Sequence, residues 1–201
     1  MRIEKLKHEF DISVKLVHFP LHPETPAEGV PLQQLFRAGP EELEARHSRM
    51  KGLMDAEGLP YGRRTHTYNS RLAQELGKWS DTQPSGERIH DALYKAYFVD
   101  GRNIGDIEVL LDLVRSIGLN EQEAREVLTS RSFKAAVDAD WTNSRAIGVT
   151  GVPTFVFGQS GVVGAQPYEV LKQLLETGGA KASDKASHDC PSSGILEQIG
   201  V

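Results

Sequence analysis

Cysteine is nearly absent from this sequence, since Cys190 is the only one among 201 residues. An intramolecular disulfide is therefore excluded, and a zinc site built mainly from thiolates is disfavoured. Redox chemistry that uses two cysteines would need a second chain or a cysteine that this sequence does not contain. Cys190 sits in a segment that superficially imitates a monothiol Cys-Pro-x-Ser motif, but its ordinary role would be that of an exposed tail cysteine.

Long apolar runs and an excess of positive charge are also missing. No stretch approaches the ~18 apolar residues of a transmembrane helix, and the first ten residues alternate charged with apolar side chains instead of forming a signal-peptide core. We therefore expect a cytoplasmic protein. The 23 Lys and Arg against 28 Asp and Glu give a formal net charge of -5, which argues against a general nucleic-acid or membrane binder.

Several kinds of site have no support in the sequence. The seven histidines are scattered, and no two of them stand four residues apart on one helix with a third ligand nearby, so we expect no metal site. No glycine-rich phosphate loop precedes a helix, and no serine lies in a nucleophile elbow. We therefore expect no cofactor.

In the first three quarters of the chain, the spacing of apolar residues predicts a helix, a strand, a loop and a helical block. Residues 2–10 have helical spacing, and residues 13–19 then alternate as a strand does. Residues 20–31 hold four prolines and a glycine, which predicts a loop. From about 40 to 147 the spacing is helical almost throughout. The length favours one compact domain with an inserted helical block.

The last quarter of the chain predicts a hairpin and a helix. Residues 154–157 are β-branched or aromatic, residues 158–161 form a turn, and residues 162–165 are a second strand candidate. Pro167 suits the first turn of a helix with an apolar face. From Thr177 onward the chain becomes small and polar, which predicts a flexible tail.

This order of elements, with the sequence Gly-Val-Pro-Thr-Phe at 151–155, resembles the thioredoxin fold as elaborated in the DsbA family of oxidoreductases. The resemblance covers about residues 1–177. Further motifs resemble the FrnE-like cytosolic branch of that family and follow in the expected order, at residues 19–29, 68–73, 96–98, 101–104, 148–157 and 164–167.

The resemblance implies an α/β, thioredoxin-like fold with a large inserted all-helical subdomain. The thioredoxin-like domain is expected at residues 1–38 and 148–178, the insert at 39–147 and a flexible tail at 179–201. Family members open with a strand that leads into Cys-x-x-Cys at the start of a long helix, whereas residues 2–10 look like the far end of that helix. The first strand and both cysteines are therefore missing.

In such folds the missing strand is central, between the strands matched by residues 13–19 and 154–157. Its absence would leave rows of backbone hydrogen-bonding groups unpaired. Each unpaired buried group costs ~1–3 kcal/mol, whereas the total stability of a domain is only ~5–15 kcal/mol. Three explanations follow: the start lies inside a longer gene product, the two remaining strands pair directly, or a partner chain fills the gap. We favour the first. An open sheet edge would also invite a homodimer.

The resemblance places a substrate site around Pro153. In the family this proline is cis and faces the redox cysteines, and the backbone of the preceding residue, here Val152, pairs with an extended peptide or glutathione. The expected substrate-binding residues are Thr150, Val152, Pro153 and His22, and the expected partner is glutathione or a peptide that contains a thiol or disulfide. Ordinary roles would be a structural turn for Pro153 and loop packing for His22.

Four further residues, Asn69, Arg71, Arg102 and Asn103, match family positions near the groove between the thioredoxin domain and the insert. Their ordinary roles would be helix capping for Asn69 and surface ion pairing for Arg71 and Arg102. No catalytic residue is assigned, because the redox step needs a thiolate at a helix N-terminus and a second thiol to resolve the mixed disulfide.

The leading hypothesis is a DsbA-like thiol-disulfide oxidoreductase by family that is redox-inactive as given, because the Cys-x-x-Cys segment is absent. Whether this chain is an enzyme therefore stays open. The second hypothesis is a redox-dead thioredoxin-fold protein that binds a peptide or partner. The third is the related glutathione-dependent isomerase or transferase branch, whose serine would also lie in the missing segment, although residues 97–104 favour the FrnE-like side.

Overall fold

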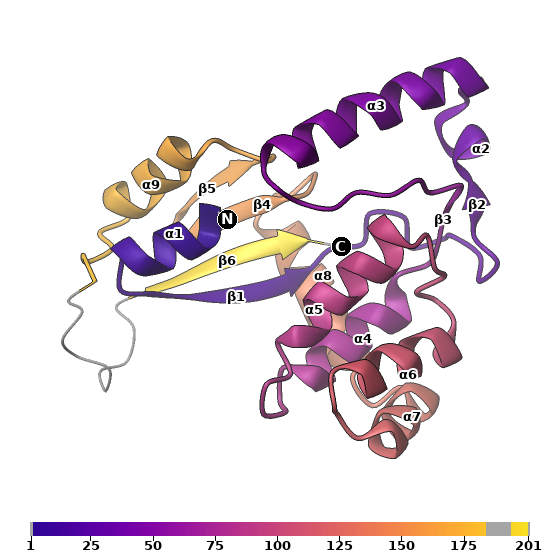
Figure 1. Ribbon diagram of the computed structural model, residues 1–201. Coiled ribbons are helices and arrows are strands. Elements are labelled where there is room, and N and C mark those ends of the chain that lie inside the picture. The colour runs from indigo at the N-terminus through magenta and orange to yellow at the C-terminus, as the bar shows by residue number, and fades with distance from the viewer. Residues whose placement is uncertain (1, 184–193, 201) are drawn as a thin grey trace. The chain divides into compact units, whose positions relative to one another are not determined.

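The computed structural model describes residues 2–183 and 194–200 of the chain (Figure 1). The chain divides into two compact units. One unit, which we call the sheet unit, is formed by Met1–Leu21 and Ala139–Val201. The other, which we call the helical unit, is formed by His22–Asp138. None of the described helices combines the length and the apolar character needed to cross a membrane.

The sheet unit is built on a four-stranded sheet with the strand order β1-β6-β4-β5. β1 (Ile12–His18) runs parallel to β6 (Gly194–Gly200). β4 (Thr154–Phe157) runs antiparallel both to β6 and to β5 (Ser160–Val163). In Figure 1 the yellow strand β6 therefore lies between β1 and β4, although it comes last in the sequence.

Apolar side chains cover both faces of this sheet. On one face, Leu196 of β6 packs with residues of α1 (Arg2–Glu9) and α9 (Tyr168–Thr177). Three residues after Leu196, Ile199 points to the opposite face, because side chains alternate along a strand. There it packs with Val17, Phe19 and Val149. Leu196 and Ile199 are both fully buried, so β6 contributes to the core on each side of the sheet.

The position of β6 corrects two expectations. The sequence predicts a flexible tail at 179–201, but residues 181–183 run antiparallel to residues 9–11 and residues 194–200 form the central strand. Direct pairing of the strands around 13–19 and 154–157 is also wrong, because β6 separates them. β6 supplies the hydrogen bonds that a missing central strand would leave unmade. Within the described strands there is therefore no gap in the sheet to favour a homodimer.

The predicted hairpin is confirmed, with its second strand at Ser160–Val163 instead of 162–165. Ser160 pairs with Phe157, so a turn of only two residues, Gly158 and Gln159, joins the strands. Gly158 has a φ of 61°, a conformation that glycine adopts without steric penalty. The shorter turn explains why the second strand begins earlier than the sequence pattern suggests.

The helical unit carries most of the remaining elements. Helices α4 to α7 share one apolar core, which includes the buried residues Trp79, Leu110 and Leu128. Strand β3 (His66–Thr67), which pairs with β2 (Val30–Pro31), lies within the expected insert and departs from its all-helical prediction. The elements are α2 (Leu32–Phe36), α3 (Pro40–Ala56), α4 (Arg71–Ser80), α5 (Arg88–Tyr94), η1 (Lys95–Val99), α6 (Ile107–Ser116), α7 (Glu121–Ser130), the start of α8 (Lys134–Ala146), β2 (Val30–Pro31) and β3 (His66–Thr67).

The unit boundaries differ from the expected domain limits, since the helical unit spans His22–Asp138 and the insert is expected at 39–147. The proline-rich loop belongs to the helical unit because side chains of that unit bind its backbone carbonyls. The second boundary falls inside α8. Asp138 forms an ion pair with Arg71 in the helical unit, whereas Asp140 accepts a hydrogen bond from the His18 amide in the sheet unit.

Candidate functional site

Three of the four residues expected to bind substrate lie together in the segment that precedes β4. Thr150 is exposed, and Val152 and Pro153 are half-buried. The Val152–Pro153 peptide bond is cis. The Thr154 hydroxyl donates a hydrogen bond to the Gly151 carbonyl at 2.7 Å, and the Gly164 amide donates to the Pro153 carbonyl at 2.7 Å. The segment is therefore held on both sides of Val152.

The main chain of Val152 is open for pairing. Neither its N–H nor its C=O makes a hydrogen bond to the part of the chain that the structure describes. The ladders of β4 with β5 and β6 begin at Thr154, so they end just short of this residue. An unpaired donor and acceptor beside the end of a sheet are the groups that strand addition by an extended peptide requires.

His22, the fourth expected residue, belongs to the helical unit. Thr150, Val152 and Pro153 belong to the sheet unit. Its side chain is exposed, so the loop-packing role is wrong for the imidazole. Its carbonyl instead accepts a hydrogen bond from the Thr25 amide at 3.2 Å, which closes a turn in the loop.

Two asparagines hold the loop that follows His22. The side-chain amide of Asn69 donates to the Thr25 carbonyl at 2.7 Å, and that of Asn103 donates to the Ala27 carbonyl at 2.9 Å. Asn69 also accepts a hydrogen bond at 2.9 Å from the amide of Arg71, the first residue of α4, although the N-cap position itself is Ser70. The sequence identifies both asparagines but does not reveal that they anchor this loop, because those contacts span 44 and 76 residues.

Arg71 is not a surface residue, contrary to the expectation. It binds Glu75 and Asp138, each at 2.7 Å, and Glu75 also binds Arg131 at 2.7 Å. The Glu75 side chain is only 1% exposed. Burial raises the pKa of Glu75, but the hydrogen bonds from Arg131 and Arg71 outweigh burial and hold the pKa below its usual value. This ion-pair network is buried at Glu75, largely buried at Arg71 and partly exposed at Arg131 and Asp138.

Arg102 behaves as predicted, since it forms a partly exposed ion pair with Asp112 at 2.8 Å. Cys190 lies outside the described residues. It is the only cysteine of the chain, so no thiol accompanies Pro153 within the described residues. Among those residues, no group of three or more His, Cys, Asp and Glu side chains is arranged to hold a metal ion. The segment around Val152 can therefore bind a ligand through main-chain hydrogen bonds.

Comparison with known proteins identifies the family and the fold of the chain. A family model described as a DSBA-like thioredoxin domain matches residues 1–176. Among solved structures, a probable DsbA oxidoreductase from Streptomyces coelicolor has a TM-score of 0.71 and 31% sequence identity, over 78% of this chain and 70% of that one. The predicted α/β, thioredoxin-like fold with a helical insertion is thereby confirmed.

Two curated relatives match at lower identity. The uncharacterized protein YwbO of Bacillus subtilis is 25% identical over 111 residues, which is 55% of this chain and 55% of YwbO. The ClpXP adapter protein SpxH of Halalkalibacterium halodurans is 27% identical over 119 residues, which is 56% of this chain and 39% of SpxH. The matches therefore span about half or less of the length of these relatives.

Proposed function

Because the chain belongs to the family of DSBA-like thioredoxin domains, we propose that it binds an extended peptide at Val152 and Pro153 and does not by itself catalyse dithiol-disulfide exchange. Its family function is thiol-disulfide oxidoreduction. That step requires a low-pKa thiolate and a resolving thiol, and Cys190 is the only cysteine present. The observation that carries the proposal is the unpaired main chain of Val152 in a chain with a single cysteine.

In this proposal the Val152 N–H donates to a carbonyl of the bound segment and the Val152 carbonyl accepts from one of its amides. The exposed Thr150 lies two residues away and contacts the same segment. The occupant is a peptide that contains a thiol or disulfide, or glutathione. A FrnE-like identity and, with it, a cytoplasmic location are part of the proposal and rest on the motifs at 19–29, 68–73, 96–98, 101–104, 148–157 and 164–167. A role of His22 in this binding stays a prediction.

A second candidate is an adapter role, in which the bound segment belongs to a partner protein. The observation that favours it is the match to SpxH, which is named as a ClpXP adapter protein. An adapter needs a binding surface and no redox-active thiol, so the lack of a cysteine pair in this sequence is compatible with that role.

The proposal predicts binding without redox turnover. In an insulin-reduction assay, the chain is expected to give no rate above the reductant alone. By calorimetry, it is expected to bind an unfolded peptide that contains a disulfide, and Val152→Pro is expected to weaken binding about fivefold to tenfold, because one main-chain hydrogen bond is lost. Circular dichroism would verify that the variant is folded.

Two controls separate main-chain pairing from other contacts. The first control uses the wild-type protein and a peptide whose backbone amides are N-methylated at alternate positions. This complex should be at least as weak as the complex of Val152→Pro with the unmodified peptide. Cys190→Ala should bind like the wild type. Insulin reduction by the wild type, or equal affinity for the normal and methylated peptides, would refute the proposal.

A further inference from the structure

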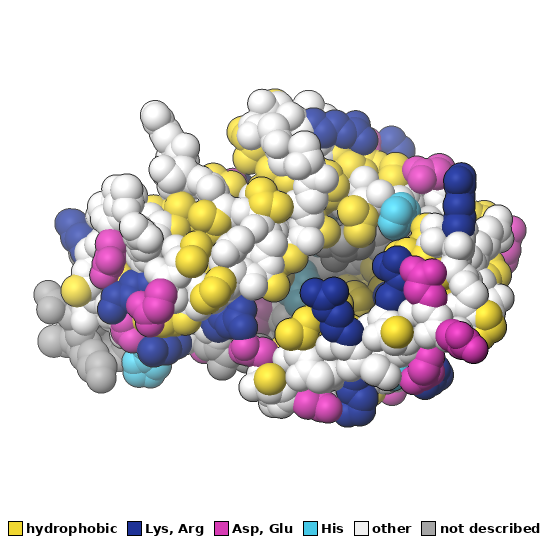
Figure 2. Space-filling view, turned by 90° about the horizontal axis from the view of Figure 1, so that it is seen from above, with side chains coloured by type: hydrophobic (Ala, Val, Ile, Leu, Met, Phe, Trp, Pro, Cys, Tyr) yellow, Lys and Arg dark blue, Asp and Glu magenta, His cyan; other side chains and the backbone are white. Residues whose placement is uncertain are grey.

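Helix α3 of the helical unit presents an apolar surface that the described residues leave uncovered. None of its 17 residues is buried. Met50 and Leu53 on α3 are 40% and 56% exposed, and Phe36 at the end of α2 is 43% exposed. In the space-filling view, hydrophobic side chains are interspersed with Lys and Arg on the visible surface (Figure 2). Large apolar side chains that gather on a surface indicate an interaction site.

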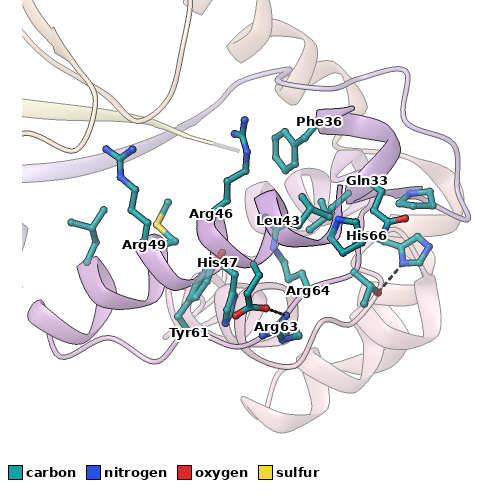
Figure 3. Close-up of a pocket in the computed structure, with 17 residues that line it drawn as sticks. Gln33, Phe36, Leu43, Arg46, His47, Arg49, Tyr61, Arg63, Arg64 and His66 are labelled. Atoms are coloured by element: carbon teal, nitrogen blue, oxygen red, sulfur yellow. Dashed lines mark hydrogen bonds and ion pairs between the residues drawn. The ribbon is translucent and has the colours of Figure 1, made fainter. Parts of the chain in front are cut away.

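The same residues line a cavity of about 720 Å³ within the helical unit. Its walls come from α2, α3 and residues 61–66, as Figure 3 shows. This volume is within the range of ligand-binding pockets. From Leu43 to Leu53 the lining of α3 extends about 15 Å, at about 1.5 Å per residue. That length suits several residues of a peptide better than one compact small molecule.

The charges that line the cavity are predominantly positive. Four arginines line it against one carboxylate, that of Glu44. Arg46 and Arg63 are already paired with glutamates, at 2.8 and 2.6 Å. Arg49 and Arg64 form no ion pair with any residue that the structure describes. In a chain with a net charge of -5, this cavity is a local concentration of unneutralised positive charge.

Arg64 gives the clearest indication of an anionic ligand. Its guanidinium lies 4.5 Å from the ring centre of Tyr97 and 4.9 Å from that of Phe98, so cation-π contacts fix its position. Its Nε is buried and has no acceptor among the described residues. A buried donor without an acceptor carries a desolvation penalty, and a carboxylate that binds the remaining N–H groups of the same guanidinium would offset its positive charge.

We propose that this cavity binds an acidic peptide segment of a partner protein. Carboxylates of the peptide bind Arg64 and Arg49, and a large apolar side chain packs against Phe36, Met50 and Leu53. Charge complementarity favours an acidic occupant, and the exposed apolar side chains favour one that also carries Leu or Phe. The site lies wholly in the helical unit and is independent of Val152 and Pro153.

Fluorescence anisotropy with the full chain tests this proposal. The probe is a fluorescein-labelled peptide of about 15 residues that is mostly Glu, with Leu or Phe at every third or fourth position. A matched peptide has Gln in place of each Glu. We expect the acidic peptide to bind at least about tenfold more tightly than the matched one, and added salt to weaken its binding. No binding, or equal affinity for the two peptides, would overturn the proposal.

Variants locate the site. Arg49→Gln, Arg64→Gln and Leu53→Ser are each expected to weaken binding of the acidic peptide about fivefold or more, because each removes one contact. The matched controls Arg145→Gln and Ile147→Ser, at exposed positions in the sheet unit, should bind like the wild type. Should Arg64→Gln fail to fold, the exposed positions Arg49 and Leu53 decide the question.

Unchanged affinity in both Arg49→Gln and Leu53→Ser would overturn the proposal. Light scattering at several concentrations tests another occupant, a second copy of the chain. A dimer that dissociates in Leu53→Ser would show that self-association covers this surface, and that outcome would also overturn a peptide site.

Discussion

Deleting residues 194–201 is expected to unfold the sheet unit. β6 pairs with β1 along seven residues and with β4 along four, so the deletion leaves the inner edges of both strands unpaired. It also removes two fully buried side chains, Leu196 and Ile199, from opposite faces of the sheet. Each buried Leu or Ile contributes about 2–5 kcal/mol, while a domain is stable by only ~5–15 kcal/mol. Hydrogen exchange of peptides from β1 and β4 would measure the loss of amide protection in these strands.

Point variants on β6 provide a matched comparison. Leu196→Ala is expected to lower the free energy of unfolding by about 2–5 kcal/mol, because it opens a cavity in the core. Ile195→Ala, one residue earlier on an exposed position, is expected to change it by less than about 0.5 kcal/mol. Urea unfolding measures both. Equal effects of the two variants, or retained protection of β1 and β4 in the deletion, would show that β6 is not the central strand.

The sequence does not reveal β6 because its buried residues do not alternate. Leu196 and Ile199 face opposite sides of the sheet, as is usual for a strand that is buried on both faces. Between them stand two polar residues, Glu197 and Gln198, and Glu197 forms an ion pair with Lys15 of β1 at 2.8 Å. That partner is 182 residues away, so local pattern gives no sign of the pairing.

Elements defined by local pattern are predicted well. β1 and the β4-β5 hairpin follow from alternation and from the glycines of the turn. The candidate site is predicted only in part. The motif around Pro153 identifies the segment, but the unpaired backbone of Val152 depends on where the β4 ladders end, which is a tertiary property. Arg71 is misassigned to the surface for a related reason, since Arg131, with which it shares Glu75, is distant in sequence.

Replacing Glu75 by alanine is expected to destabilise the helical unit by about 1.5–3 kcal/mol, because Arg71 and Arg131 both lose charge-assisted hydrogen bonds to the buried carboxylate. Glu108→Ala is the matched control. Glu108 binds Arg125 on the exposed surface, so Glu108→Ala is expected to lower the free energy of unfolding by less than about 1 kcal/mol. Urea unfolding followed by the fluorescence of the buried Trp79 measures both. A similar effect of the two variants would contradict the prediction.

The difference in the free energy of unfolding between the wild type and Glu75→Ala is also expected to become smaller at low pH. The pKa of Glu75 is lower in the folded protein than its ordinary value, since Arg131 and Arg71 outweigh the effect of burial. The folded state therefore favours the charged carboxylate. Its contribution is fully present above the ordinary pKa of about 4.3 and is lost as the pH falls through the folded pKa. Urea midpoints of both proteins at pH 7 and near pH 3 test this, because a structural role without charge would leave the difference constant.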